Sequence, residues 1–472
     1  MAQARVVNID RIEEKAPASG GLLLALVGLG IAFLIITAML GIAKTHQPLF
    51  TESNMLYGAL IFYAGAGALY MGFGVTGTER YIKYASLFTA IGWIANTLAA
   101  GHRWYQSGRP PFASIYEMLL SFVWTVALLT LIAEKKYGVR IVGSITMPLA
   151  VVSVILMQLL PSEVRPLVPA LQSTWLHVHV TLAMLSYAAC AVSFAIAMMF
   201  LIQDNFKTSD FQFWTALTSA ATFLAITATR FRAGSLAVAA WDLERKSDIV
   251  EQGNTHVFVG IPELGWLFIL AALGALIPLA LNVFARVKKN EQAYAWADKG
   301  MFISILLQVA TLSAFILRAR QGVYLTPEGD ELPTVLAASP FILGGVISSI
   351  FGSLLYLMLL WRRTDLQKML PPAETLDRVT YKTICIAFPL LTGMIAAGAY
   401  WANRTWGSYW SWDPKEDWAA ITWLIYALYL HMRITRGWRG RRAAYFAIFG
   451  FAVVIFTFLG VTYLLPGLHA YA

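Results

Sequence analysis

Long apolar runs are the feature of this sequence that most limits its possible folds. Runs of about 20 residues, the length of a helix that crosses a roughly 30 Å hydrocarbon core, lie at 21–43, 141–160, 182–202, 264–285, 341–361 and 443–465. Hydrophobic residues make up 58% of the 472 residues and charged residues only 13%, which is too apolar for a soluble domain of this length. We therefore predict an all-α fold, a polytopic transmembrane helical bundle of about 13 spans.

Basic residues indicate the orientation of the predicted bundle. They gather in four loops, at residues 135–140, 288–289, 362–368 and 433–442. Counting spans places all four loops on the same side, and loops rich in Lys and Arg face the cytoplasm. We therefore expect a cytoplasmic N-terminus and a C-terminus on the outer face. The net charge of +9 requires no nucleic-acid partner, because a solvated cytoplasmic face explains it.

Domain organisation and cysteine usage add further expectations. Residues 1–20 lack the short apolar run and small-residue cleavage site of a signal peptide, so we expect the first span to be retained. Without repeats or long linkers, a single membrane domain over 1–472 is favoured. Cys190 and Cys385 both lie in apolar runs and form no CxxC pair, so we expect no thiol–disulfide exchange by this chain.

A short stretch near the C-terminus, WGSYWSWDPKEDWAAITW at residues 406–423, contains five of the 16 tryptophans. Asp413, Pro414 and Glu416 have the spacing of a capping box for a helix that starts near Asp417. The aromatic residues have two interpretations: the interfacial belt common in membrane proteins, or a platform for a large planar ligand. Composition alone leaves both open for the residues that crowd this loop, Trp401, Trp406, Tyr409, Trp410 and Trp412.

The positions of three histidines bear on this choice. His179 begins a span after an outer loop, and His469 follows the last span on the same predicted face as the tryptophan stretch. His431 lies near the inner end of the span that starts at that stretch. A lone histidine in a span is commonly a hydrogen-bonded packing residue, but ionisable residues inside membranes are functional candidates. Two neutral imidazoles over an aromatic floor are what a six-coordinate haem iron requires.

Four ordered motifs resemble one protein family. WANRTWGSYWSWDPKEDWAAITWLIYALYLHMR, at residues 401–433, is similar to the tryptophan-rich WWD signature of the CcsA/ResC proteins, which attach haem to cytochrome c in the System II pathway. The likeness extends to RWYQSGRPPFASIYE at 103–117, PLVPALQSTWLHVHVTLAMLSYAA at 166–189 and FTFLGVTYLLPGLHAYA at 456–472.

The usual short family pattern lacks four of the predicted spans. Two soft seams, at 204–210 and 365–378, bracket these spans, which are typical of an insertion because removing them would leave both flanks on their own sides. We therefore divide the chain into an N-terminal family core at 1–205, an inserted four-span segment at 206–372 and a WWD haem-handling core at 373–472.

The resemblance implies roles for residues at matching positions. The family's paired external histidines correspond to His179 and His469, implied as catalytic residues and as axial ligands of the haem iron. His177 has no clear family counterpart, yet a shift of two residues would exchange it with His179. His431 corresponds to the family's transmembrane histidine and is implied in the haem path from the cytoplasm. We place Asp413 with the catalytic residues and assign haem binding to His179, His469, His431, Trp401, Trp406, Tyr409, Trp410, Trp412 and Arg404. Arg404 or Arg103 is a candidate to meet the haem propionates, although Arg404 stands where a smaller or acidic residue is expected.

The resemblance also implies an activity and partners. The activity is that of a holocytochrome c synthase, which joins the two vinyl groups of haem b (iron protoporphyrin IX) to the thiols of a CxxCH motif. The implied partners are apocytochrome c, a CcsB/ResB-type membrane protein and a thiol-reducing thioredoxin-like protein. The implied location is the bacterial inner membrane or the plastid thylakoid membrane, with the WWD loop on the periplasmic or lumenal side. The alternative is a haem exporter or chaperone that presents haem without catalysing attachment; a secondary transporter is disfavoured because no inverted repeat is present.

Overall fold

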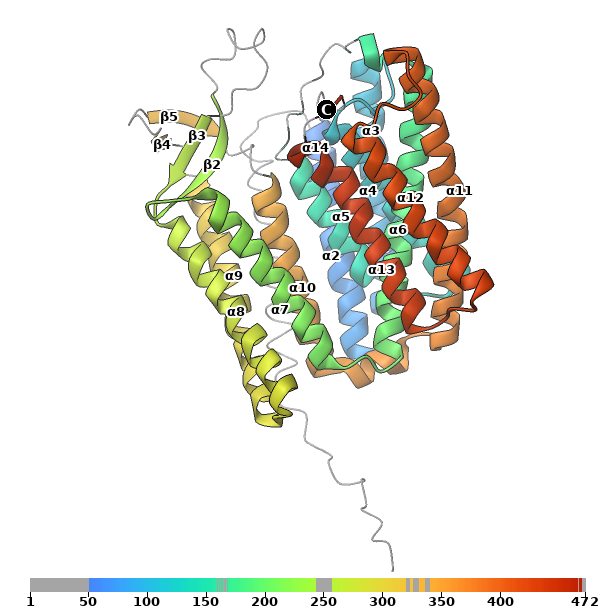
Figure 1. The fold of residues 1–472 in the computed structure, drawn as a ribbon. Coiled ribbons are helices and arrows are strands. Elements are labelled where there is room, and N and C mark those ends of the chain that lie inside the picture. The colour runs from blue at the N-terminus through green and yellow to red at the C-terminus, as the bar shows by residue number, and fades with distance from the viewer. Residues whose placement is uncertain are drawn as a thin grey trace, which may run out of the picture.

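The computed structural model describes residues 51–158, 160, 162, 164, 167, 169–242, 257–319, 323–325, 331–335, 340–465, 467 and 468. The first predicted span and three histidines, His46, His256 and His469, lie outside the described residues. The described chain forms a bundle of long helices, with a small sheet at one end (Figure 1).

The helices fall into three stretches of sequence. The first contains α2 (Glu52–Thr76), α3 (Glu79–Ser107), α4 (Ile115–Tyr137), α5 (Gly143–Gln158), the short η1 (Pro169–Leu171) and α6 (Thr174–Gln203). The second contains α7 (Thr208–Arg230), α8 (Leu264–Lys288), α9 (Glu291–Ala319) and α10 (Pro340–Met369). The third contains α11 (Ala373–Trp406), α12 (Pro414–Thr435), α13 (Arg441–Ile455), the π-helical turn η3 (Phe456–Gly460) and α14 (Val461–Leu464).

The length and apolar character of these helices confirm the predicted all-α membrane fold. Among the described residues, eight helices are long and apolar enough to cross a membrane: α2, α4, α6, α8, α9, α10, α11 and α13 continued by η3. The chain is therefore a multi-pass membrane protein. The total of about 13 spans and the sides on which the termini lie stay predictions.

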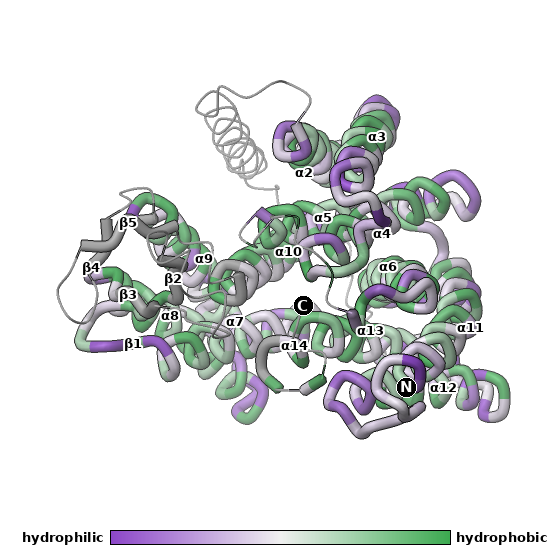
Figure 2. Tube along the Cα trace, turned by 90° about the horizontal axis from the view of Figure 1, so that it is seen from above, coloured by the Kyte–Doolittle hydropathy of each residue, from purple (hydrophilic) through white to green (hydrophobic). Residues whose placement is uncertain are grey.

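Helix α6 lies at the centre of the main helix group, packed against α4, α11 and α13 (Figure 2). Its middle is rich in small residues, and Ala188, Cys190, Ala191 and Ser193 are fully buried. Small side chains let helix backbones approach closely in a membrane, where packing rather than water exclusion drives helix association. The close packing of α6 on α11 fixes the neighbourhood of His179, which lies in the second turn of α6.

Helices α7, α8 and α9 form a side group, and α10 lies between this group and the main one (Figures 1 and 2). One polar cluster joins all four helices. Gln212 of α7 donates to Asp298 of α9 at 2.8 Å, Asn282 of α8 donates to Gln212, and the Tyr356 hydroxyl of α10 donates to Asp298. Polar side chains within a membrane find their hydrogen-bond partners inside the bundle. This cluster therefore fixes the positions of the four helices relative to one another.

A small antiparallel sheet caps one end of the side group (Figure 1). Its strands are β1 (Phe231–Arg232), β2 (Ser235–Asp242), β3 (Val257–Ile261), β4 (Val323–Leu325) and β5 (Glu331–Val335). The order is β1-β2-β5-β4, with β3 also paired to β2. The sequence analysis did not predict these strands, which are short and belong to the two loops between the helices.

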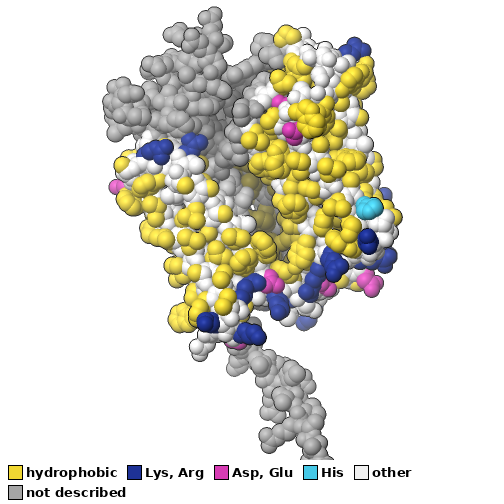
Figure 3. Space-filling view, viewed as in Figure 1, with side chains coloured by type: hydrophobic (Ala, Val, Ile, Leu, Met, Phe, Trp, Pro, Cys, Tyr) yellow, Lys and Arg dark blue, Asp and Glu magenta, His cyan; other side chains and the backbone are white. Residues whose placement is uncertain are grey.

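Basic side chains gather at the opposite end of the molecule, toward the bottom of the face drawn in Figure 3. Three ion pairs join neighbouring helices: Arg441 of α13 pairs with Asp204 after α6 at 2.5 Å, Arg433 of α12 with Asp377 of α11 at 2.6 Å, and Arg286 of α8 with Asp210 of α7 at 2.7 Å. We call this the basic end of the bundle, and the end at which α11 leads into α12 the platform end. The predicted cytoplasmic location of the basic end follows from the positive-inside rule.

Candidate functional site

The loop from α11 to α12, residues 407–413, is here called the tryptophan loop. Gly407 ends α11 with φ +77°, and its N–H donates to the Asn403 carbonyl at 3.0 Å, a helix end that favours glycine. The predicted capping box is confirmed: the Asp413 side chain caps α12, and Glu416 Oε2 accepts from the Asp413 N–H at 3.3 Å. Both ends of the tryptophan loop are therefore fixed by local hydrogen bonds.

The aromatic residues around this loop occupy different environments and do not form a flat platform. Trp401 is buried, 1% exposed, and its indole N–H donates to the Ala170 carbonyl at 3.0 Å. Trp406 packs edge-on against Trp401, with ring centroids 4.9 Å apart. Tyr409 and Trp412 are 58% and 77% exposed, whereas Trp410 lies between them in sequence and faces a pocket.

This pocket lies between α6, α11, the start of α12 and the π-helical turn η3. The pocket opens to the surface, and its empty space of about 950 Å³ includes solvent at its mouth. Most of its lining is apolar. An imidazole, two indoles, an ammonium group and a carboxylate also line it, from His179, Trp401, Trp410, Lys415 and Glu416. Trp401, Tyr409 and Trp410 contribute to its wall; Trp406, Trp412, Arg404, His431 and Asp413 are not among its lining residues.

The orientation of the His179 ring suits a metal ligand. Its Nδ1 lies 2.8 Å from the Met394 carbonyl oxygen of α11. Because a carbonyl oxygen only accepts, Nδ1 carries the proton and the lone pair is on Nε2, the arrangement common to metal-binding histidines. The ring stacks on Trp401 with an interplanar angle of 24°.

Glycine at position 398 permits this close approach of α6 and α11. A Cβ atom there would lie 2.6 Å from His179 Nδ1 and 2.8 Å from Cε1, closer than side-chain atoms pack. The imidazole is thus held by a carbonyl on one atom, an indole on one face and a bare backbone at its edge. One oriented imidazole and an aromatic wall are the groups by which proteins bind a planar macrocycle with a central metal.

His177 does not share this environment. Two helical residues turn about 200° around the axis, so His177 leaves the opposite side of α6. It lies 6.1 Å from the Phe112 ring and is not among the pocket residues. Of the two alternatives left open by the sequence, the geometry therefore favours His179.

Asp413 connects the tryptophan loop to the C-terminal segment. It is 5% exposed and accepts hydrogen bonds from the backbone N–H groups of Lys415, at 3.0 Å, and of Leu468. The carboxylate packs so closely on Gly467 that a Cβ there would lie 2.3 Å from Oδ1. Leu468 directly precedes His469, which lies outside the described residues. Asp413 thus has a positioning role, because it joins the tryptophan loop to Leu468, the residue before the predicted second ligand.

Two further predicted residues lie away from the pocket. Arg404 donates to the Tyr400 hydroxyl at 2.8 Å, and its guanidinium lies over the Tyr400 ring. His431 is an exposed residue near the far end of α12, 17 residues and about 25 Å along the axis from Pro414. The structure therefore separates His431 from His179 by most of the length of a helix.

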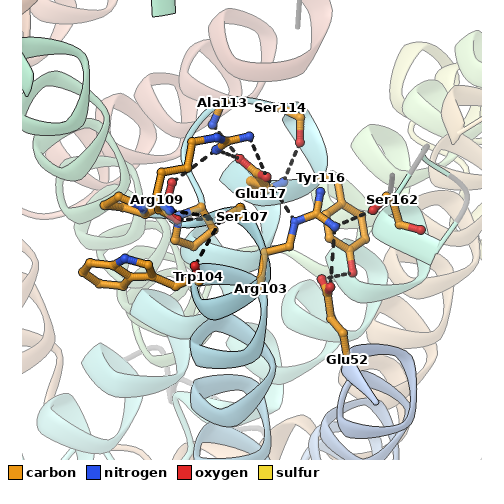
Figure 4. A network of polar contacts seen from close by, with 12 residues as sticks. Glu52, Arg103, Trp104, Ser107, Arg109, Ala113, Ser114, Tyr116, Glu117 and Ser162 are labelled. Atoms are coloured by element: carbon orange, nitrogen blue, oxygen red, sulfur yellow. Dashed lines mark hydrogen bonds and ion pairs between the residues drawn. The ribbon is translucent and has the colours of Figure 1, made fainter. Parts of the chain in front are cut away.

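The motif at 103–117 forms a buried network of charges beside the pocket (Figure 4). Arg103, 2% exposed, pairs with Glu117 at 3.1 Å and with Glu52 at 3.5 Å. Arg109 pairs with the same Glu117 carboxylate at 2.8 Å, and the Ala113 N–H donates to it at 2.7 Å. The charge of Arg103 is thereby balanced by two carboxylates, and the network holds the turn that carries Phe112 to the pocket wall.

Sequence reasoning missed three contributors to the pocket. Gly398 and the Met394 carbonyl orient His179, but a single glycine and a backbone oxygen in an apolar span give no distinct sequence signal. Lys415 was interpreted only as part of the cap, although a lysine beside the acidic N-cap of a predicted span was visible. The roles of the predicted site residues stay predictions.

Comparison with known proteins assigns the family. The sequence matches the family described as Cytochrome C assembly protein over residues 112–241 and 264–469, a match that runs through much of the segment 206–372. The Cytochrome c biogenesis protein CcsA of Trichormus variabilis is 34% identical over 375 residues, covering 79% of this chain and 83% of the relative. The CcsA of Picosynechococcus sp. is 31% identical over 425 residues, covering 89% of this chain and 95% of the relative. The chain therefore belongs to the cytochrome c assembly family and, within it, to the CcsA proteins.

Proposed function

We propose that this cytochrome c biogenesis protein binds haem b in the pocket beside the tryptophan loop and, with a CcsB/ResB-type partner, attaches it to apocytochrome c. The observation that carries the proposal is the oriented imidazole of His179, whose Nδ1 is held by the Met394 carbonyl inside an aromatic pocket. The Gly398 backbone at its edge and the Trp401 indole on its face add to this hydrogen bond, so the ring is oriented from three sides.

The chain's own residues supply binding and position in this proposal. His179 and His469 bind the haem iron, and Trp401, Tyr409 and Trp410 pack against the macrocycle. Trp406 packs edge-on against Trp401, and the exposed Trp412 of the tryptophan loop contacts the arriving substrate peptide. Asp413 is a positioning residue, because its carboxylate fixes Leu468 next to His469.

The chemistry requires no nucleophile from this chain. Each cysteine S–H of the CxxCH motif adds across one vinyl C=C of the haem substrate. The sulfur bonds to one vinyl carbon, the hydrogen ends on the other, and no electrons are exchanged overall. The catalytic contribution is therefore the alignment of the vinyl edge with the peptide, while a thioredoxin-like protein keeps the substrate cysteines reduced.

The remaining parts of the proposal concern membrane side and haem supply. The basic end faces the cytoplasm of the bacterial inner membrane, or the equivalent side of a thylakoid membrane, so the tryptophan loop lies on the periplasmic or lumenal side. His431 is exposed on α12 near the basic end, where a helix of the partner can complete a haem entry site with it.

Covalent attachment of haem distinguishes this function from haem export. The chain is co-expressed with a CcsB/ResB-type partner and an apocytochrome c in bacteria that lack their own cytochrome c maturation system. We expect haem that stays on the cytochrome in a denaturing gel. A cytochrome whose CxxCH cysteines are replaced by serine is the matched control and should show no haem in the same gel. Haem that accumulates on the outer side without any thioether product, from a complex that assembles normally, would instead identify an exporter.

A further inference from the structure

Lys415 is a basic side chain in the wall of the pocket. It is the second residue of α12, directly after Pro414, and it lines the pocket opposite α6 and α11. Its Nζ donates to the Thr462 hydroxyl of α14 at 2.8 Å. This contact holds the ammonium group between the tryptophan loop and the C-terminal helix.

The neighbouring acids have other hydrogen-bond partners. Glu416 also lines the pocket, but its Oε2 accepts from the Ser411 N–H at 2.8 Å, the Ser411 hydroxyl at 3.1 Å and the Asp413 N–H. The Asp413 carboxylate accepts from the backbone N–H groups of Lys415 and Leu468. Both carboxylates thus accept hydrogen bonds from the tryptophan loop, the helix cap and the C-terminal segment.

The other basic candidates are turned elsewhere. Arg103 is enclosed by Glu52 and Glu117, and Arg404 lies over Tyr400. Among the described residues that line the pocket, Lys415 is the one Lys or Arg.

The electrostatics of Lys415 favour an incoming anion. Lys415 precedes the apolar part of α12, which the sequence places from about Asp417 onward. Burial lowers the pKa of Lys415 to about 8, although the nearby Asp413 charge acts in the opposite direction. A desolvated ammonium gains more from a new anionic partner than one in water, because the interaction is less screened.

We propose that Lys415 binds a carboxylate of the pocket's ligand, so that the site selects a planar macrocycle with an acidic edge. This inference rests on the proposed function and adds an orientation to it. In haem b the propionates and the vinyl groups lie on opposite edges of the macrocycle. A propionate on Lys415 therefore turns the vinyl edge away from α12.

Haem and its dimethyl ester distinguish a carboxylate contact from general packing. The two ligands share the iron and the ring, but the ester lacks the negative charges. Purified protein in detergent, with the partner, is stripped of haem and titrated with each ligand while the Soret band is recorded. We expect the wild type to bind haem roughly tenfold or more tightly than the ester, as a charge-assisted contact allows.

Substitutions assign that preference to one residue. Lys415→Met should weaken haem binding about tenfold and leave ester binding unchanged, while Lys415→Arg should retain most of the preference. Lys299→Met is the matched control, because it removes an exposed lysine on α9 over Trp296 and should change neither affinity. Unchanged ester binding by Lys415→Met also shows that the variant is folded.

Each other outcome contradicts a different claim. A wild type that binds haem and ester equally, or a Lys415→Met protein that keeps the wild-type preference, would overturn the carboxylate contact while leaving the haem site intact. A wild type that binds neither ligand would count against the haem site itself.

Discussion

Replacing His179 with alanine is expected to abolish cytochrome c maturation and to leave a protein that added imidazole partly restores. The substitution removes the Nε2 atom that we propose binds the iron, and it opens a space the size of the lost ring. Loss of a partner that only orients a metal ligand costs roughly 10–100-fold in metal affinity or activity, so loss of the ligand itself should cost at least as much. Free imidazole can enter through the open mouth of the pocket and bind the iron. The measurement is the yield of covalent cytochrome c with and without imidazole.

Two variants separate a ligand from a packing residue. His177→Ala removes the same ring two residues away, outside the pocket and against Phe112, and should mature cytochrome c nearly normally. Gly398→Ala keeps the His179 imidazole but places a methyl group 2.6 Å from Nδ1, so it should alter the haem spectrum and resist rescue by imidazole. If His177→Ala lost cytochrome c maturation and imidazole restored it, while His179→Ala matured cytochrome c normally, the iron ligand would be His177 instead of His179.

Replacing Glu117 with alanine is expected to destabilise the protein by about 3–5 kcal/mol, the cost of breaking a buried ion pair from one side. Glu117 is 1% exposed and accepts from Arg103, Arg109 and the Ala113 N–H. Its loss leaves two guanidinium groups with one carboxylate, Glu52, in the interior. The same change should loosen the turn that carries Phe112. Thermal unfolding of the purified protein in detergent measures the effect.

A salt bridge at the surface provides the control. Glu79 pairs with Arg140 at 2.9 Å, but both side chains are more than half exposed, at 64% and 55%. Such pairs contribute about 0–1 kcal/mol, so Glu79→Ala should unfold close to the wild-type temperature. Equal, small effects of Glu117→Ala and Glu79→Ala would show that the network in Figure 4 contributes little to stability.

The membrane fold and the cap of α12 were predictable because their signals are local. Runs of apolar residues identify spanning helices without knowledge of their neighbours, and the Asp413, Pro414 and Glu416 spacing specifies a helix start within one turn. The structure confirms both. The small sheet was not predictable in the same way, since β2 pairs with β5 across two intervening helices.

The contacts that form the pocket could not be predicted from the sequence. The aromatic-rich loop left an interfacial belt and a ligand platform both open, because the depth of each ring depends on distant backbone: Trp401 is buried, and its N–H donates to the Ala170 carbonyl. Lys415 gains its place in the pocket through Thr462, 47 residues away. The orientation of His179 depends on Met394 and Gly398 of another helix. Spacing within one segment cannot predict contacts that the packing of α6 on α11 creates.

The central claim, that His179 and His469 bind haem at the platform end, is tested most directly by the absorption spectrum of the protein purified with its partner. The cells must make haem and contain no substrate cytochrome. We predict a b-type, low-spin spectrum with two imidazole ligands, which is lost or shifted in His179→Ala and unchanged in His177→Ala. A colourless wild-type complex, folded and purified from haem-replete cells, would contradict the claim.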